Sequence, residues 1–450
     1  MLLNKPITKL LILIVFFLFI SISAQQKEKM LLSLKDALEL SREGNYELKL
    51  AQAEVDKMQA DKNKSLAVFL PQITLSETYV KTDDPLNVFG LKLKQKIVSM
   101  ADFNPLLLNN PNEFNNYNTK LEMLQPLINL DGFFGRNAAA EGLAALNFKR
   151  QRTENYVDFM VKATYFQLVL TMNSLDVINQ ALNTAKANRK LIKDYYDEGM
   201  ITKADYLRGE VYVADVESKK VEVENALQKV NDNLRVMLGF EKDVIFQPTD
   251  TLGLPQISST NFDTKSIIES RSDIQAYSHK VSSFKSMKLM NQMKFLPRLN
   301  AFGIYEYNDA KAFGNSAKNW MIGLNLQWNI FNGFQNVAGI QKSAAELDQA
   351  EIEYRKALTK GQTEIEEAFR DLETAKAKVD LAKTAAEQSD ESLKITHDRY
   401  EKGMEKTTDL VNAQTAASGT HLNYLQAVYF YNVSVFKIEL MIEKKFEINQ

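Results

Sequence analysis

The side chains that most often carry enzyme chemistry are few and scattered in this chain. There is no cysteine among the 450 residues, which excludes thiolate metal sites, disulfides and cysteine nucleophiles. The three histidines are His279, His397 and His421, and none stands at a spacing that indicates a metal site. Acidic runs such as Glu364 to Glu367 are typical of the solvated face of a coiled coil rather than of a catalytic carboxylate pair. The sequence therefore predicts no enzyme, no cofactor and no metal site.

The first 24 residues differ from the rest of the chain. Lys5 and Lys9 precede an apolar run from Leu10 to Ile20, and small residues lead to Ala24. This pattern predicts a secretory signal peptide over residues 1–24, with an uncleaved membrane anchor as the alternative. No later apolar run reaches the about 18 residues of a membrane-spanning helix, so we expect an exported chain that is soluble or crosses a membrane as strands. The net charge of −2 gives no indication of a nucleic-acid partner.

The positions of the prolines predict long helices. None occurs between Pro126 and Pro248 or after Pro297, and a proline inside a helix costs about 3 kcal/mol. Residues 136–239 and 336–444 are instead rich in Ala, Leu, Lys, Glu and Gln. A helix over residues 335–400 would be roughly 100 Å long at about 1.5 Å per residue. Apolar or small residues at 3-4 spacing predict a coiled-coil seam along it: Ile365, Ala368, Leu372, Ala375, Val379, Ala382, Ala386, Ser389 and Leu393.

One structural unit occurs twice in the sequence. Three motifs recur in the same order: Phe-Leu-Pro at 69–71 and 295–297, a strand-to-helix junction at 125–133 and 327–334, and a turn at 195–200 and 399–404. In both turns an aspartate follows the glycine by six positions, at Asp205 and Asp409. We predict a first repeat over residues 25–240, a linker over 241–263, a second repeat over 264–444 and a tail over 445–450. Each repeat reads helix, strand, strand, long helix, turn, helix.

Four segments have the composition of strands: Ile73–Val80, Lys120–Leu127, Leu299–Tyr307 and Trp320–Ile330. In the last of these, apolar residues alternate with polar or small ones, and a tryptophan stands at each end of the apolar face. This pattern fits a membrane strand with interfacial aromatics and, equally, a half-buried strand of a soluble sheet. Residues 81–119 predict a large loop with extended strand ends, and residues 308–318 a polar loop.

Four strands are too few to close a barrel, for which about eight is the practical minimum. An open edge facing lipid is not tolerated, so membrane strands would have to be pooled from several chains. Two chains would supply eight strands, and three would supply twelve and leave room for a lumen. The same pooling would gather the long helices into a tube, without deciding between three chains and four.

The chain resembles the TolC-like outer-membrane efflux family from about residue 32 to residue 442. The resemblance rests on the junctions at Asp131-Gly132 and Asn332-Gly333 and on the two Tyr-x-x-Gly-x-x-x-x-x-Asp turns. It implies a mainly α fold with a membrane β part, in which long coiled-coil helices form an α-barrel. Four strands per chain would contribute to a shared twelve-stranded trimeric β-barrel.

The function that the resemblance implies is a passive exit duct in a tripartite efflux or type I secretion system. A homotrimer would lie in the cell outer membrane, extend into the periplasm and dock a periplasmic adaptor joined to an inner-membrane pump. The alternative is a periplasmic or surface coiled-coil structural protein without a channel.

The resemblance also assigns roles near the second turn. Asp409 matches the acidic position of a periplasmic gate, and the family's second acidic position is Asn412 here. Tyr400 and Asp205 match a tyrosine–aspartate latch, while the family's arginine in that latch falls on Glu405. The two aspartates equally fit negative charges favoured by the helix dipole.

The turns themselves would dock the adaptor through Gly199, Met200, Gly403 and Met404. The glycines equally fit helix C-caps, where a residue with positive φ ends the helix.

Overall fold

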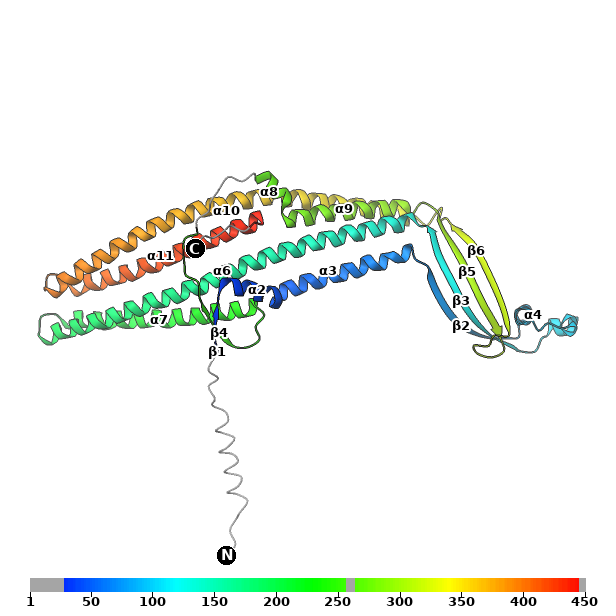
Figure 1. Cartoon of the computed structure of the whole chain (residues 1–450), viewed down its shortest axis with the longest axis horizontal. Coiled ribbons are helices and arrows are strands. Elements are labelled where there is room, and N and C mark those ends of the chain that lie inside the picture. The colour runs from blue at the N-terminus through cyan, green and yellow to red at the C-terminus, as the bar shows by residue number, and fades with distance from the viewer. Residues whose placement is uncertain (1–27, 256–263, 445–450) are drawn as a thin grey trace, which may run out of the picture. The chain divides into compact units, whose positions relative to one another are not determined.

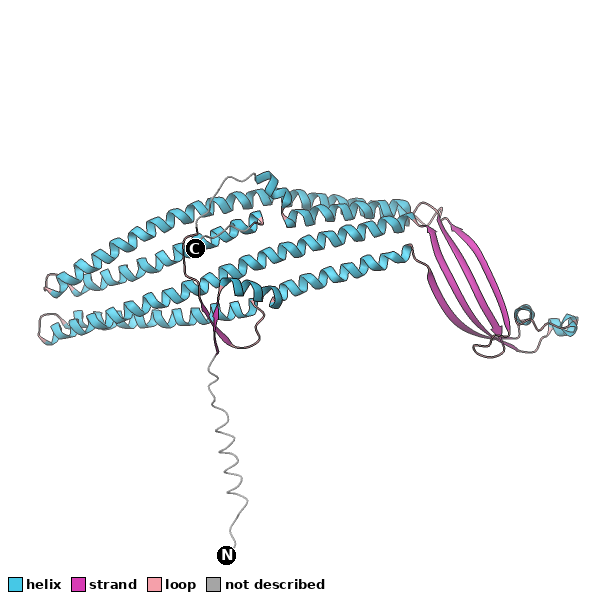
Figure 2. Cartoon of the chain, viewed as in Figure 1, coloured by secondary structure: helices cyan, strands magenta, loops and turns pink. Residues whose placement is uncertain are grey.

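The computed structural model describes residues 28–255 and 264–444. The predicted signal peptide, the predicted tail and residues 256–263 of the predicted linker lie outside this range. The described chain is mainly helical, with six strands (Figure 1 and Figure 2). It divides into two compact units, each built from separate stretches of sequence. Unit 1 comprises residues 1–51, 151–271 and 361–450, and unit 2 comprises residues 52–150 and 272–360.

The long helices follow the predicted order. The first half contains α2 (Leu34–Gly44), α3 (Tyr46–Lys64), η1 (Ser65–Val68), α6 (Leu130–Asp197) and α7 (Lys203–Met237). The second half contains α8 (Thr264–Ser270), α9 (Ser272–Met293), α10 (Gln335–Glu401) and α11 (Thr407–Ile442). The two predicted long helical stretches are confirmed, and each is divided by a tight turn. Within residues 28–255 and 264–444, no helix is both long and apolar enough to span a bilayer.

Four antiparallel strands form the sheet of unit 2, in the order β2 (Gln72–Thr82), β3 (Phe114–Ile128), β5 (Arg298–Asp309) and β6 (Ala317–Gln327). All four predicted strands are confirmed. The expected end of the last one at Ile330 is wrong, because β6 stops where Arg298 pairs with Gln327. The residue before Arg298 is Pro297, which has no N–H to continue the ladder.

The predicted extended strand ends within residues 81–119 are confirmed, since β2 reaches Thr82 and β3 begins at Phe114, but the predicted loop between them is wrong. This segment contains α4 (Pro85–Lys94), the 3₁₀ turn η2 (Met100–Phe103) and the short helix α5 (Pro105–Asn109). A proline stands in the first turn of both α4 and α5, where its missing N–H has no helical partner to lose. The prolines that suggested a loop therefore begin helices.

A parallel pair of short strands, β1 (Glu28–Leu32) and β4 (Val244–Pro248), lies in unit 1 and was not predicted. Side chains satisfy its backbone groups. The Asn231 side chain donates from Nδ2 to the Val244 carbonyl at 2.8 Å, and its Oδ1 accepts from the Phe246 N–H at 2.8 Å. The Tyr165 hydroxyl donates to the Leu32 carbonyl at 2.9 Å. These bonds hold strands that are too short to be stable alone.

The core of unit 1 is built where these strands meet α6, α7 and α11. Leu32 and Phe246 from the strands pack with Tyr165, Leu234 and Phe436 from the helices. Along α10, most of the predicted heptad seam is confirmed as buried: Ile365, Ala368, Leu372, Ala375, Val379 and Ala386.

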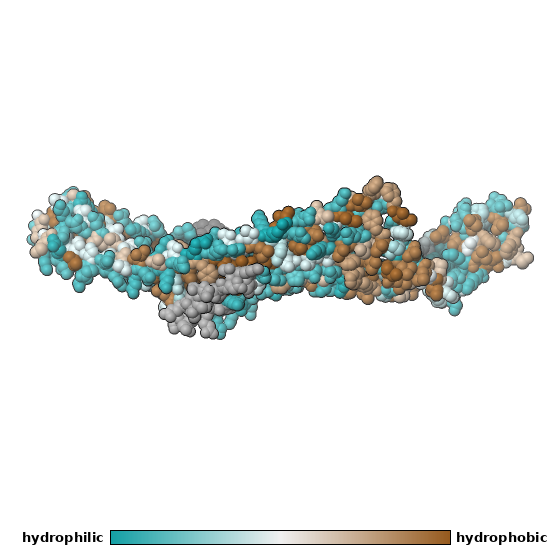
Figure 3. Space-filling view, turned by 90° about the horizontal axis from the view of Figure 1, so that it is seen from above, coloured by the Kyte–Doolittle hydropathy of each residue, from teal (hydrophilic) through white to brown (hydrophobic). Residues whose placement is uncertain are grey.

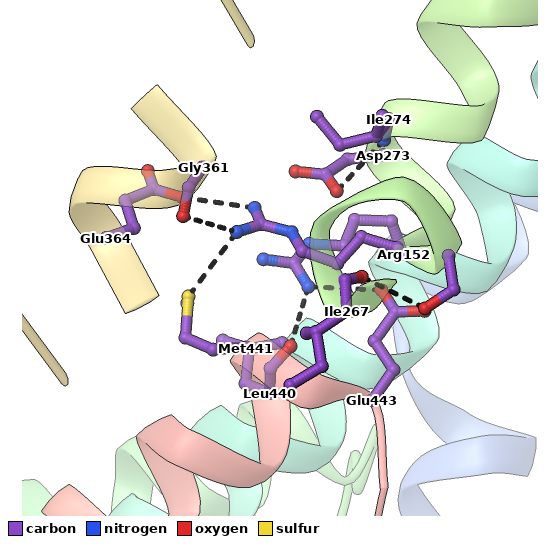
Figure 4. Close-up of polar contacts among 11 residues, drawn as sticks. Arg152, Ile267, Asp273, Ile274, Gly361, Glu364, Leu440, Met441 and Glu443 are labelled. Carbon is purple, nitrogen blue, oxygen red and sulfur yellow. Dashed lines mark hydrogen bonds and ion pairs between the residues drawn. The ribbon is translucent and has the colours of Figure 1, made fainter. Parts of the chain in front are cut away.

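Buried charges also connect the elements of unit 1. Lys162 on α6 forms an ion pair with Glu439 on α11, and both side chains are more than nine-tenths buried. Arg271, only 2% exposed, donates to the Gly361 carbonyl at 3.4 Å and to Glu364 Oε2 at 3.1 Å. Figure 4 shows the neighbouring Arg152, whose Nη1 donates to the Leu440 carbonyl at 2.7 Å and to Glu443 at 3.1 Å. Arg271 Nη1 also lies 3.8 Å from Met441 Sδ, so both arginines contact the end of α11.

The Lys162–Glu439 pair yields a stability prediction. Glu439→Ala leaves a buried ammonium without its carboxylate, and we expect it to lower the free energy of unfolding by about 3–5 kcal/mol. Lys162→Met combined with Glu439→Leu removes both charges and should stay near the wild type. Thermal and urea unfolding followed by circular dichroism measures both variants. Equal losses in the single and double variants would contradict a charge-pair effect.

Candidate functional site

One face of the sheet in unit 2 is apolar and exposed. Cross-strand neighbours form apolar rungs, of which the first is Leu75, Leu121, Tyr305 and Trp320 and the next is Ile73, Met123, Gly303 and Ile322. Trp320 is 72% exposed and Leu324 is 67% exposed. Figure 3 shows hydrophobic residues gathered toward the strand-bearing part of unit 2. A free apolar surface of this extent marks a site of interaction.

The opposite face of the same sheet is polar. Its residues alternate with the apolar ones because successive side chains of a strand point to opposite faces. They include Asn118, Lys120 and Glu122 on β3 and Glu306 and Asn308 on β5. The sheet thus has one mainly apolar and one mainly polar face, although Phe302 and Ile304 also lie on the polar side.

Two exposed tryptophans, Trp320 and Trp328, lie along the apolar face near the start and just beyond the end of β6. They are eight positions apart in the sequence. At about 3.3 Å per residue this is roughly 26 Å along an extended chain, or about 20 Å of height at the about 40° tilt of outer-membrane strands. Trp328 donates from Nε1 to the Phe295 carbonyl at 2.9 Å, as expected of an aromatic with one polar atom.

The sheet is open at both edges. β2 and β6 each pair on one side only, so a row of backbone N–H and C=O groups is unpaired along each outer strand. Such edges adjoin the apolar face and require another chain if that face meets lipid.

The first predicted turn lies in unit 1, between α6 and α7. Gly199 has φ +74°, and the Met200 N–H donates to the Tyr195 carbonyl at 2.9 Å, which closes the end of α6. Thr202 caps α7. Its hydroxyl donates to Asp205 Oδ2 at 2.6 Å and accepts from the Asp205 N–H at 3.2 Å. The Asp205 carboxylate is therefore engaged by its own turn.

The second turn, between α10 and α11, has the same backbone and a different cap. Gly403 has φ +70°, and the Met404 N–H donates to the Arg399 carbonyl at 2.9 Å. Lys406 occupies the cap position and makes no side-chain cap bond. Asp409 is exposed. Its carboxylate makes no ion pair or side-chain hydrogen bond with residues 28–255 or 264–444. Asn412, also exposed, follows three positions later on the same helix face.

Tyr400 is 2% exposed, and burial raises the pKa of its hydroxyl. The hydroxyl shares a hydrogen bond with Thr407 Oγ1 at 3.1 Å, and the ring lies 5.7 Å from that of Tyr195. No hydrogen bond is described between Tyr400 and Asp205 in the part of the chain that the structure covers, although the Asp205 charge contributes to the raised pKa of Tyr400. The tyrosine–aspartate latch stays a prediction.

Other polar contacts at the turns were not predicted. Glu405, which stands where the family has an arginine, accepts from Arg399 Nε at 2.7 Å within its own turn. Arg208 Nη1 donates to Thr408 Oγ1 at 2.6 Å and lies 3.5 Å from Asp205 Oδ1. Arg208 thus joins the start of α7 to the start of α11. The only sequence signal for it is its position three residues after Asp205.

The outermost turn residues are accessible. Met200 is 65% exposed and Met404 is 63% exposed. Nothing lies within 4 Å of a Cβ built on Gly199 or Gly403. The positive φ, rather than crowding, is the reason for glycine at these positions.

The described residues include one group of possible metal ligands, on α10. One ligand atom from each of His397, Asp398 and Glu401 lies within 4.8 Å of the others. The four-residue spacing of His397 and Glu401 was not recognised in the sequence. All three lie on an accessible face of the helix, where acidic groups are common without a metal, so the group alone does not make a site.

Part of this chain is similar in sequence to a known protein family. The profile of the family described as outer membrane efflux protein matches residues 264–439. Over these residues the chain is similar to that family. The resemblance noted from the sequence is thereby confirmed, and the efflux-protein match covers the second predicted repeat.

One sequence relative and several solved structures are also similar to this chain. Outer membrane protein OprJ of Pseudomonas aeruginosa is 25% identical over 154 residues, which cover 34% of this chain and 32% of OprJ. The aligned region is thus about a third of the length of that relative.

A membrane protein from Pseudomonas aeruginosa has a similar structure at 17% identity, with a TM-score of 0.79 over 91% of this chain and 93% of that chain. The CmeC outer membrane channel of Campylobacter jejuni has 17% identity and a TM-score of 0.77 over 93% and 87%. At these identities the structural likeness shows the fold, and it confirms the mainly α fold with a β part.

The turn glycines can be tested directly. Gly403→Ala puts a side chain at positive φ, and we expect a local loss of about 1–2 kcal/mol at the turn. Gly419→Ala is the matched control, because Gly419 lies within α11 with open space around it and should gain up to about 1 kcal/mol. Amide hydrogen exchange of peptides covering residues 399–425 measures both. Unchanged protection in the Gly403 variant would show that the positive φ is not required.

Proposed function

We propose that this chain is the outer-membrane channel component of a tripartite efflux or type I secretion system. It is a passive exit duct for substrates that an inner-membrane pump and a periplasmic adaptor deliver. It makes and breaks no covalent bond and needs no cofactor. The protein resides in the cell outer membrane and extends into the periplasm, after export directed by residues 1–24.

The observation that carries the proposal is the open, two-faced sheet. One face is apolar and exposed, and among the described residues the edge strands β2 and β6 each pair on one side only. A closed barrel satisfies both edges and places the apolar face toward lipid and the polar face toward water. Three copies supply twelve strands, and similarity to the efflux family favours a trimer.

The repeats account for the helical part of the duct. Residues 25–240 and 264–444 are the two outer-membrane efflux repeats, joined by residues 241–263 and followed by the tail at 445–450. The long helices of three copies form the α-barrel. Its turns, with Gly199, Met200, Gly403 and Met404 at their accessible ends, dock the adaptor.

The gate lies at Asp409 and Asn412. The free carboxylate of Asp409 supports this assignment, because three such charges around one axis concentrate negative potential and favour cations. The latch at Tyr400, Asp205 and Glu405 forms part of the same gate. In this chain Arg399 and Arg208 contribute the cationic groups that the family's arginine supplies elsewhere.

Detergent extraction followed by conductance recording tests the channel proposal. We expect a trimer from the outer-membrane fraction that conducts ions in planar bilayers, whereas a water-soluble monomer would favour a coiled-coil structural protein. Leu324→Arg places a charge near the middle of the apolar band and should cost about 2–4 kcal/mol per site, with loss of membrane assembly. Asn325→Arg, on the polar face, is the control. If both variants assemble equally well, the apolar face does not meet lipid.

The gate assignment predicts a change in ion selectivity. A unit charge about 6 Å from an ion in water contributes about 0.7 kcal/mol, or roughly a threefold change in ion occupancy. Asp409→Ala should therefore lower the cation-over-anion permeability ratio, read from reversal potentials in asymmetric salt. Asp398→Ala removes an equal, exposed charge from α10 and should have a smaller effect. Equal selectivity in the wild type and Asp409→Ala would reject the gate role.

A further inference from the structure

Residues 83–113, between β2 and β3, fold into a compact insertion rather than a flexible connection. Asp84 caps α4 by accepting from the Asn87 N–H at 2.8 Å, and Asn104 caps α5 by accepting from the Leu106 N–H at 3.0 Å. Lys92 donates to Asp102 Oδ1 at 2.6 Å, and this bond lowers the pKa of Asp102 to about 2. The bond joins α4 to η2.

The insertion has a small core of its own. Val88 is buried, and the rings of Phe89 and Phe103 meet edge to face at 5.7 Å. These contacts hold α4, η2 and α5 together as one folded element, which lies beyond the strand ends in Figure 1.

The end of α4 is bound to the polar face of the sheet. Gln95 donates from Nε2 to Asn116 Oδ1 at 2.8 Å, and Asn116 donates to Asn308 Oδ1 at 2.9 Å. Lys94 reaches Glu306 Oε1 at 3.3 Å. Gln95, Asn116 and Asn308 are all buried. The sheet residues in these contacts are at even-numbered positions of β3 and β5. Their side chains therefore lie on the polar face, opposite the apolar rungs.

The insertion also touches the edge strand β6. Lys96 Nζ donates to the Lys318 carbonyl at 2.9 Å, and Asn319 Nδ2 donates to the Lys94 carbonyl at 3.3 Å. The insertion begins directly after β2, the other edge strand. The insertion is therefore connected to one edge strand by the chain and to the other by hydrogen bonds.

The outer surface of the insertion is apolar. Met100 is 87% exposed, Leu86 is 81% exposed and Leu106 is 77% exposed. Leu93, Ile97, Phe103 and Leu107 add to this surface. A folded element with capped helices and an uncovered apolar surface indicates an interface.

We propose that the insertions of three copies meet on the channel axis and form a second, apolar constriction at the end of the barrel remote from the helices. The inference rests on the proposed channel function. In a barrel with its apolar face outward, the polar face lines the lumen, so an element bound to that face projects into the lumen. There the insertion of a neighbouring copy is the available partner for Met100, Leu86 and Leu106. Apolar rings of this kind close pores by excluding water.

Cysteine cross-linking tests the contact, since the chain has no native cysteine. Met100→Cys and Leu106→Cys should each give cross-linked dimers in the assembled trimer with a short bis-maleimide. Lys311→Cys, in the exposed β5–β6 loop outside the insertion, is the control and should remain monomeric on denaturing gels.

Conductance tests the constriction. Leu86→Ser, Met100→Ser and Leu106→Ser combined should raise the single-channel conductance by about twofold or more, because polar side chains admit water. Conducting trimers that give no cross-links at positions 100 and 106, and whose conductance is unchanged in the triple variant, would overturn this inference. The proposed channel function would be unaffected by that result. Failure of the wild type to form conducting trimers would instead reject the channel function.

Discussion

The unpaired backbone groups along β2 and β6 are the constraint on which the rest of the structure depends. In lipid, where water cannot hydrate it, each such group costs several kcal/mol unless another strand pairs with it. Within residues 28–255 and 264–444, no further strand pairs with β2 or β6 at those edges. Assembly is therefore a condition for placing this sheet in a membrane, and the helices that lead into and out of the strands must gather with them.

The alternation of side chains along the same strands determines what each face can bind. A shift of one residue in the pairing would move the apolar set to the other face, so the register is strongly specified. The buried asparagines at the outer end of the polar face add to this specification. Asn308 Oδ1 accepts hydrogen bonds from both Asn116 and Asn118, which joins β5 to β3 at this end. Asn116 in turn accepts a separate hydrogen bond from the Gln95 side chain of the insertion.

Much of the fold could be predicted from the sequence because long periodic patterns are reliable. The heptad seam of α10, the alternation of β6 and the turn glycines all have a repeating signal. The pair β1–β4 has no repeating signal in the sequence, because each strand has only five residues. It depends on side chains of distant helices, Asn231 and Tyr165. α4 and α5 were missed because prolines and asparagines that cap short helices also occur in loops. The partners of Tyr400 and Glu405 depend on side-chain packing, which spacing alone does not show.

The two turns have the same backbone conformation at the glycine but differ in how the following helix is capped. Thr202 and Lys406 occupy equivalent positions, and only the threonine completes a capping box. A side-chain cap stabilises a helix by about 1 kcal/mol, so the start of α11 lacks a local stabilisation that the start of α7 has. The Asp205 carboxylate is held by Thr202, whereas Asp409 has no such cap residue beside it and is exposed. One turn thus uses its aspartate as a structural support, and the other presents it as an available charge.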